Sequence, residues 1–226
     1  MQENDDSVEE GVVAHPDFML NDPSQIIFDF PDDENVTSPY LKIDLLPEVD
    51  IRNLTLNLDS DQRRVFDIMI DYTIKLKRWK EKLDKFKGPP PLPPHMVLQG
   101  QAGAGKTTLI EALSQRIEKL MRSSGDAPDH PYILKMAFTG TAASHIGGQT
   151  IHSAFSLKFG GAYVSLTREK VKKVSPSMDQ LTFCIIDEFS LDSPDLLYHI
   201  HCRLNEIKCI ASRDFIPFGG VCHLNR

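Results

Sequence analysis

A glycine-rich segment beginning at Gly100 has the residue types and spacing of a phosphate-binding loop. The residues GQAGAGKT, 100–107, match the pattern G-x-x-x-x-G-K-[ST]. In such a loop the glycines let the backbone curl so that its N–H groups point at phosphate oxygens, and the helix that follows adds its positive end. The lysine reaches the β- and γ-phosphates, and the next hydroxyl binds Mg²⁺. The segment therefore predicts a nucleotide site whose members are Gly100, Gly103, Ala104, Gly105, Lys106, Thr107 and Thr108.

Two adjacent carboxylates, Asp187 and Glu188, follow the apolar run FCII and could complete this site. Asp187 would orient Mg²⁺ through its water shell, and Glu188 would act as the general base that polarises a water for attack on the γ-phosphate. Adjacent acids at a strand end are also common helix caps, so the pair is informative only together with the loop. A carboxylate that activates water favours ATP hydrolysis over phosphate transfer by a small-molecule kinase.

Alternating strand and helix patterns surround these residues. Apolar runs at 96–100, 132–138 and 181–187 predict strands, and the spacing of apolar residues predicts a helix over 107–122. A further helix is expected after Ser193 as its cap, with Pro194 at its first position. Strands that alternate with helices predict an α/β fold with a parallel sheet. The third of the predicted strands ends at Asp187.

A long helix and a proline linker precede this core. Apolar residues recur at steps of three or four over residues 60–87, which predicts one helix capped by Asp59 or Ser60 and ended by Gly88. The inward face comprises Val65, Ile68, Met69, Tyr72, Leu76, Trp79, Leu83 and Phe86. The prolines of residues 88–94 predict a stiff spacer, after which the NTPase core runs over 95–226.

The charge of the chain is unevenly distributed. The net charge is −7, but residues 1–57 hold 14 acidic and 2 basic residues, whereas the remainder holds 18 acidic and 23 basic ones. Scattered prolines and the lack of periodicity predict that residues 1–54 form an acidic, largely disordered leader to a domain at 55–226. No apolar run approaches the roughly 18 residues of a membrane span. The four cysteines fit no standard zinc spacing, which favours reduced thiols.

Five segments, in this order, carry a family resemblance: LNLDSDQRRVFDIMI, LQGQAGAGKTTLI, FTGTAASHIGGQTIHSAF, CIIDEFSL and PFGG. Together they resemble the first motor domain of the petite-integration-frequency type of superfamily-1 DNA helicases, including those of Helitron transposons. The resemblance covers about residues 55–220. The phosphate loop and the Asp-Glu pair occur in many NTPases, whereas IGGQTIHSAF is the specific segment.

The resemblance implies a RecA-like P-loop domain and ATP-driven 5′-to-3′ translocation on single-stranded DNA, in an intracellular, nuclear protein. It implies that Gln62 reads the adenine, although by itself Gln62 is an ordinary first-turn residue. The implied DNA contacts are Thr139, Gly140, Thr141 and His152. Hydroxyl groups and backbone N–H groups suit phosphate contact without base readout. Without the resemblance, His152 is more simply a structural histidine.

Two departures from the family pattern lead to specific expectations. Phe138 stands where the family usually has proline, which changes the stiffness of the loop. After PFGG the family continues into another apolar strand and a glutamine motif, whereas this sequence ends in VCHLNR. We therefore expect a sheet that is incomplete at its C-terminal end, with no second motor domain and no arginine fingers, and a fragment that is inactive alone. The alternatives are an ATP- or DNA-binding module without catalysis, or an unrelated P-loop NTPase; the oligomeric state stays open.

Overall fold

The computed structural model describes residues 43–82, 88–101, 103–127, 129–158, 160–188, 193–211 and 216–226. Most of the predicted acidic leader, residues 1–42, lies outside these ranges. The fold described below belongs to the unit that spans residues 38–226.

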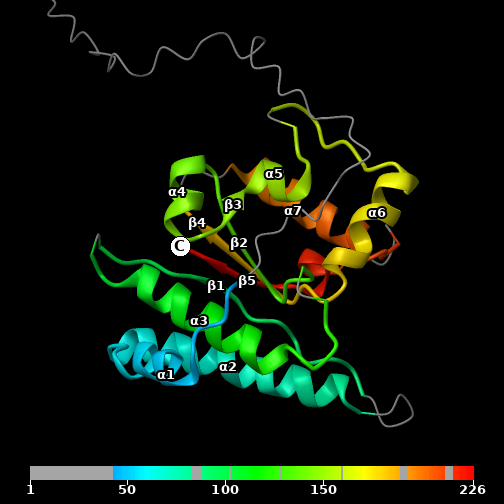
Figure 1. Cartoon of the computed structure of the whole chain (residues 1–226). Helices are drawn as coiled ribbons and strands as arrows, with labels where there is room; N and C mark the ends of the chain where they lie inside the picture. Colours follow the sequence, from blue (N-terminus) through cyan, green and yellow to red (C-terminus); the bar gives the residue numbers. More distant parts are fainter. Residues whose placement is uncertain are drawn as a thin grey trace, which may run out of the picture. The chain divides into compact units, whose positions relative to one another are not determined.

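The core of this unit is a five-stranded parallel sheet (Figure 1). Its strands are β1 (His95–Val97), β2 (Ile133–Ala137), β3 (Gln149–Thr150), β4 (Phe183–Asp187) and β5 (Cys222–Asn225). They lie in the order β1-β5-β4-β2-β3. The prediction of an α/β fold with a parallel sheet is confirmed.

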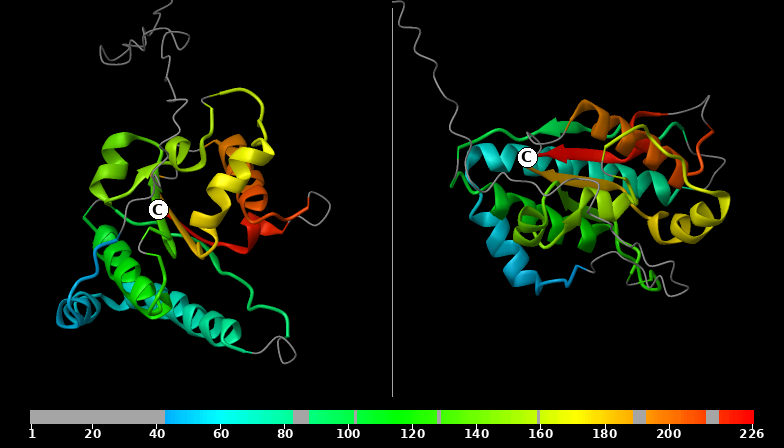
Figure 2. Two further views of the ribbon diagram at one scale, coloured as in Figure 1. Left: turned by 45° about the vertical axis from the view of Figure 1, so that its right-hand side comes forward. Right: turned by 90° about the horizontal axis from the view of Figure 1, so that it is seen from above.

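Helices cover both faces of the sheet. The helices are α1 (Glu48–Leu56), α2 (Ser60–Lys80), α3 (Lys106–Met121), α4 (Gly140–His145), α5 (Ile151–Phe155), α6 (Arg168–Met178) and α7 (Pro194–Ile207), with a short 3₁₀ turn at Pro217–Gly220. Helices α2 and α3 pack on one face, and α5, α6 and α7 pack on the other; the turned view at the left of Figure 2 shows the same separation. Within the described residues, no helix has both the length and the apolar character that crossing a membrane requires.

The strand sequences explain these two layers. Successive side chains of a strand point to opposite faces, and a parallel sheet covered on both faces needs apolar residues at every position. In β4, Phe183 and Ile185 join the core formed with α2 and α3, whereas Cys184 and Ile186 join the core formed with α7. All five β4 residues, including Asp187, are buried.

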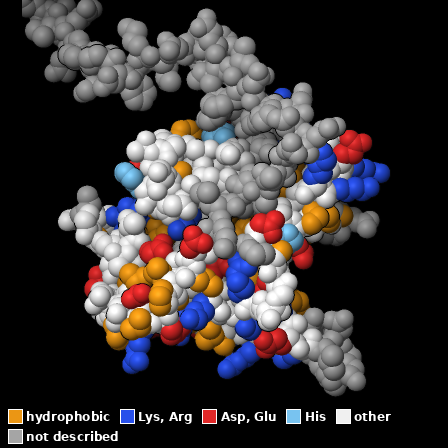
Figure 3. Space-filling view, viewed as in Figure 1, with side chains coloured by type: hydrophobic (Ala, Val, Ile, Leu, Met, Phe, Trp, Pro, Cys, Tyr) orange, Lys and Arg blue, Asp and Glu red, His pale blue; other side chains and the backbone are white. Residues whose placement is uncertain are grey.

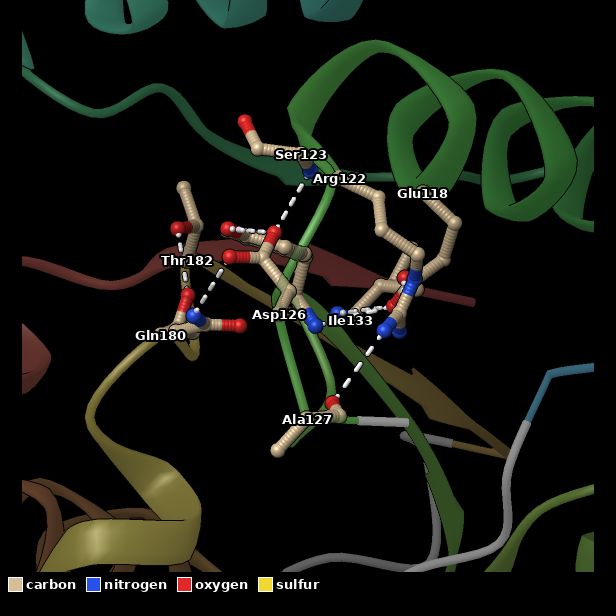
Figure 4. A network of polar contacts seen from close by, with 9 residues as sticks. Glu118, Arg122, Ser123, Asp126, Ala127, Ile133, Gln180 and Thr182 are labelled. Carbon is tan, nitrogen blue, oxygen red and sulfur yellow. Dashed lines mark hydrogen bonds and ion pairs between the residues drawn. The ribbon is translucent and has the colours of Figure 1, made fainter. Parts of the chain in front are cut away.

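A buried carboxylate fixes the start of β2 against the end of α3. Glu118 is 1% exposed, and its Oε1 accepts hydrogen bonds from the backbone N–H groups of Tyr132 (2.8 Å) and Ile133 (3.2 Å). Its other oxygen pairs with Arg122 at 2.8 Å. Beside it, Asp126 accepts from the backbone N–H of Ser123, from the Tyr132 hydroxyl and from Gln180 (Figure 4). The network joins α3, β2 and the segment before β4, and so sets their relative positions.

The N-terminal helices differ in part from the prediction. The predicted leader extended to residue 54, but residues 48–56 form α1, with Ile51 fully buried. Glu48 on α1 pairs with Arg116 and Lys119 of α3, at 3.0 and 2.7 Å. Because these ion pairs join residues that are distant in sequence, the local sequence pattern did not predict α1.

Helix α2 begins as predicted with an Asp59 cap, but it ends at Lys80, before the predicted members Leu83 and Phe86, which lie outside the described residues. Its buried face is also rotated from the predicted one. Phe66 is buried, whereas Ile68 is 49% exposed. The buried face is determined by the packing of α2 against α3, which the sequence pattern of α2 alone does not specify.

A strand follows PFGG, although no strand was predicted there. Residues Cys222–Asn225 form β5, which pairs in parallel with β1 on one side and with β4 on the other. Cys222, His223 and Leu224 are all buried. The strand was missed because His223 and Asn225 interrupt the apolar run that a buried parallel strand normally shows.

Burial of His223 predicts a specific loss of stability in acid. The ring is 1% exposed, neither ring nitrogen has a hydrogen-bond partner among the described residues, and the centroid of the Phe218 ring lies 4.1 Å from its own. Burial, followed by the nearby His95 and His201, lowers the pKa of His223 from 6.5 to about 3. Below about pH 6.5 the unfolded chain therefore takes up a proton that the folded chain refuses. Because of this one group, the free energy of unfolding should fall by about 2 kcal/mol when the pH is lowered from 7 to 5.

Urea denaturation at the two pH values tests this expectation. His223→Leu should lose less stability between pH 7 and pH 5 than the native chain, because it removes the group that titrates only after unfolding. His145→Gln, at an exposed position, should keep the native pH dependence. An unchanged pH dependence in His223→Leu would contradict the assignment.

Candidate nucleotide-binding site

The predicted phosphate loop connects β1 to α3 with the backbone conformation that such loops need. Gly103 and Gly105 have φ angles of 80° and 66°, in the left-handed region that glycine adopts without strain. The Ala104 N–H donates to the carbonyl of Gln101 at 3.2 Å. The first helical bond of α3 runs from Leu109 N–H to the Gly105 carbonyl at 3.1 Å. The N-terminus of a sixteen-residue helix thus opens directly from the loop.

The side chain of Lys106 is held inside the loop. Its Nζ donates to the carbonyl oxygens of Gly100 and Gln101, at 2.7 and 2.8 Å. These bonds keep the ammonium group over the loop's own concave backbone, where phosphate oxygens would lie. Thr107 and Thr108 follow in the first turn of α3, and both are exposed.

Gln62, from the first turn of α2, lies against the loop. Its Nε2 donates to the Ala104 carbonyl at 2.9 Å, and its Oε1 accepts from the Asp59 N–H at 3.1 Å, which completes a capping box. A Cβ at Gly105 would lie 2.5 Å from this Nε2, so a side chain at that position would displace the Gln62 amide. The amide therefore connects α2 to the loop, and a role of Gln62 in reading the adenine stays a prediction.

Thr107 and Asp187, the two predicted metal ligands, meet at one cationic group. Nη1 of Arg226 donates to Thr107 Oγ1 at 2.9 Å and to Asp187 Oδ2 at 3.1 Å. A hydroxyl and a carboxylate that both reach one nitrogen can also address one cation, and oxygen ligands are those that Mg²⁺ prefers. The residues present therefore fit a divalent ion.

Thr107 and Asp187 would supply two oxygen ligands to such an ion. The described residues contain no group of three or more His, Cys, Asp or Glu side chains that could hold a metal. Mg²⁺ commonly keeps several waters and binds through one or two protein ligands plus substrate phosphates. Two protein oxygens beside the phosphate loop are compatible with that mode of binding.

Glu188 lies one residue beyond β4 in a constrained conformation. Its φ is 56°, which is uncommon for a residue other than glycine, and its N–H donates to Asp187 Oδ1 at 2.9 Å. Its Oε2 lies 3.4 Å from the hydroxyl of Thr139, which follows β2. Because β2 and β4 pair with Ala137 opposite Asp187, the predicted general base and the predicted DNA segment are neighbours.

The predicted DNA contacts separate into exposed and buried residues. Thr139, Gly140 and Thr141 are exposed, and the Thr139 hydroxyl caps α4 by accepting from Ala142 N–H at 3.2 Å. His152 is 7% exposed, and its ring packs edge-on against Phe138 at 5.7 Å. Burial lowers the pKa of His152. The structure therefore places the first three residues on the surface and His152 in the interior against Phe138.

An open groove of about 380 Å³ adjoins the exposed residues. It is lined by Gly140, Ala143, Ser144, Gly147, Gly148, Gln149, Thr150 and Ser153. Apart from Gln149, these residues are glycine, alanine, serine and threonine, so small residues line the groove. Gly148 allows a close approach here, since a Cβ would lie 2.3 Å from the Lys135 carbonyl oxygen.

Sequence reasoning missed Arg226 as a member of the site. No motif includes it, and its place depends on β5 lying between β1 and β4. The only signal was the sequence distance to PFGG, which has meaning only once the strand order is known.

A glycine loop between a strand and a helix, with a carboxylate at the end of a neighbouring parallel strand, defines a P-loop NTPase domain. A model of the family described as PIF1-like helicase matches residues 89–224. The chain therefore belongs to the PIF1-like helicase family.

Individual relatives agree with this assignment. The chain is 32% identical over 125 residues to the ATP-dependent DNA helicase PIF1 of Emericella nidulans, covering 54% of this chain and 16% of that protein. It is 33% identical over 126 residues to the ATP-dependent DNA helicase PIF1 of Trypanosoma brucei brucei, covering 56% and 11%. Its fold is similar to that of unliganded Pif1 from Bacteroides sp, with a TM-score of 0.50 and 25% identity over 74% of this chain and 30% of that chain. The chain thus spans less than a third of each.

The double contact of Gln62 predicts a measurable contribution to stability. Gln62→Ala removes half of the capping box of α2 and the bond to the phosphate loop, so the free energy of unfolding should fall by about 1 kcal/mol. Gln62→Glu keeps an acceptor for the Asp59 N–H but loses the donor to Ala104. Its free energy of unfolding should therefore lie between those of the native chain and Gln62→Ala. Urea denaturation measures both. An alanine variant as stable as the native chain would show that neither contact matters.

Proposed function

We propose that this domain binds ATP together with Mg²⁺, with Lys106 and the loop backbone on the phosphates and Thr107 and Asp187 on the metal side. The observation that carries this proposal is that Thr107 and Asp187, 80 residues apart in the chain, reach the same cationic group at 2.9 and 3.1 Å beside the loop. A bound metal would neutralise charge that develops on the phosphates.

Within that site, we assign the water-activating role to Glu188. Its carboxylate is exposed and follows the metal-side Asp187 directly, and the residue's left-handed backbone turns it away from the line of β4. Its contact with Thr139 supports communication between the nucleotide site and the segment after β2. A DNA phosphate that drew the Thr139 hydroxyl to itself would release the carboxylate to accept a proton from water.

We propose that the groove beside α4 receives the backbone of single-stranded DNA. The exposed Thr139, Gly140 and Thr141 offer hydroxyl and N–H donors, which suit phosphates without reading bases. The exposed basic side chains of α6 lie across α5 and α7 from α4, and Figure 3 shows them gathered at that end of the face. DNA binding in the groove would therefore depend only weakly on salt, since few phosphates meet a Lys or Arg.

For the longer proteins of the family, whose curated members are named ATP-dependent DNA helicases, we propose that this domain is the first half of a motor that moves 5′-to-3′ along single-stranded DNA. Motors of this kind close two domains around ATP, and an arginine from the opposite side of the cleft accelerates hydrolysis by roughly 10³–10⁵ in related P-loop enzymes. By that reasoning the 226 residues alone bind the ligands but unwind no duplex.

Thermal unfolding with and without ATP and Mg²⁺ tests the nucleotide site. A ligand at about 100 times its dissociation constant stabilises the folded form by about 2.7 kcal/mol, so the midpoint should rise by several degrees. Lys106→Ala should abolish the rise, whereas Lys75→Ala, an exposed lysine on α2, should keep it. An equal rise in Lys106→Ala would place the nucleotide elsewhere.

Fluorescence anisotropy of a labelled DNA single strand tests the groove. Ser144→Asp puts a negative charge in the groove lining and should weaken DNA binding several-fold, because the carboxylate repels phosphates. Ser165→Asp carries the same charge at an exposed position outside that lining and should bind as the native chain does. Equal weakening by the two variants would remove the groove from the proposal.

A further inference from the structure

The position of Arg226 supports an inference that goes beyond ATP binding. This inference rests on the proposed nucleotide site. Its Nη1 bridges Thr107 Oγ1 and Asp187 Oδ2, the two groups assigned to the metal. We propose that Arg226 is a built-in competitor of the divalent ion: its guanidinium holds the metal ligands in the absence of nucleotide and must leave before ATP and Mg²⁺ bind.

The contact is firmly anchored at its backbone end. The Arg226 N–H donates to the Ile186 carbonyl at 2.8 Å, next to Asp187 in β4. On the other side of β5, the Leu98 N–H donates to the Asn225 carbonyl at 2.6 Å. Residue 226 therefore emerges between the end of β1 and the end of β4, and its side chain needs no rearrangement of the sheet to reach either group.

The electrostatics favour the guanidinium until a stronger cation arrives. Asp187 has only 6% of its side chain exposed and Arg226 only 23%, so the ion pair is weakly screened by solvent. A single positive charge occupies the place where a divalent ion would act. The guanidinium cannot remain there together with the metal, because both need the same two oxygens.

Competition has a quantitative consequence for affinity. If the guanidinium engages the site in about nine of ten molecules, the apparent dissociation constant for ATP with Mg²⁺ is about tenfold weaker than the intrinsic one. Removing the guanidinium should recover that factor. Without Mg²⁺ there is no gain, since the competition concerns the metal ligands and not the phosphate loop.

Equilibrium titration with a fluorescent ATP analogue, at several Mg²⁺ concentrations and in EDTA, tests this proposal on the 226-residue chain. Arg226→Ala should bind the analogue about tenfold more tightly than the native chain in Mg²⁺ and no more tightly in EDTA. Its ligand-free thermal midpoint should be lower, because Asp187 loses its buried partner. Arg168→Ala, an exposed residue of α6 with the same change in net charge, should behave as native.

The outcomes separate this proposal from the one it rests on. Equal affinities of Arg226→Ala and the native chain in Mg²⁺, or weaker binding by the variant, would overturn the competition, and weaker binding would assign the guanidinium to the phosphates. No Mg²⁺-dependent binding by any form would overturn the nucleotide site itself. If Arg226→Ala does not fold, Arg226→Lys decides: its ammonium keeps the charge but ends one bond short of the Nη1 position that bridges the two oxygens, so the variant should still bind more tightly than native.

Discussion

The site depends on one constraint, the parallel pairing of β5 with both β1 and β4. Strand β1 leads into the phosphate loop, and β4 ends at Asp187. These two strands do not touch each other; β5 spaces them by pairing with each in register, His223 lying opposite His95 on one side and opposite Cys184 on the other. Because all strands run the same way, their carboxyl ends lie at one edge, which is where ligands bind in open parallel sheets.

Contacts on both sides of the sheet position the residues at this edge. On one side α2 fixes the loop through Gln62, and the buried Glu118 fixes α3 to the start of β2. On the other side the segment after β2 brings Thr139 within 3.4 Å of Glu188. The candidate nucleotide site and the exposed segment after β2 thus lie at adjacent strand ends, where Glu188 contacts Thr139. That proximity is a physical basis on which binding at one site could change chemistry at the other.

Local patterns predicted the parts of the site that local chemistry determines. The Lys106 loop and the Asp187 strand end carry their own residue signatures, so both could be located before the fold was known. Strand β5 could not be located in this way, because His223 and Asn225 make its sequence polar. Its burial depends on the Phe218 ring and on the pairing with β1, which the local sequence does not indicate. Arg226 was unpredictable for a related reason: its role arises from strand order, which places residues distant in sequence side by side.

The central claim is that Thr107 and Asp187 form the metal side of a nucleotide site that Arg226 occupies until ATP binds. A crystal structure of the chain with Mn²⁺ and a non-hydrolysable ATP analogue tests it most directly, since manganese is located by its anomalous scattering. We expect the manganese peak between the Thr107 hydroxyl and the Asp187 carboxylate, the triphosphate on the loop around Lys106, and the guanidinium of Arg226 displaced from both oxygens. A manganese ion elsewhere, or an unmoved Arg226 beside a bound triphosphate, would contradict it.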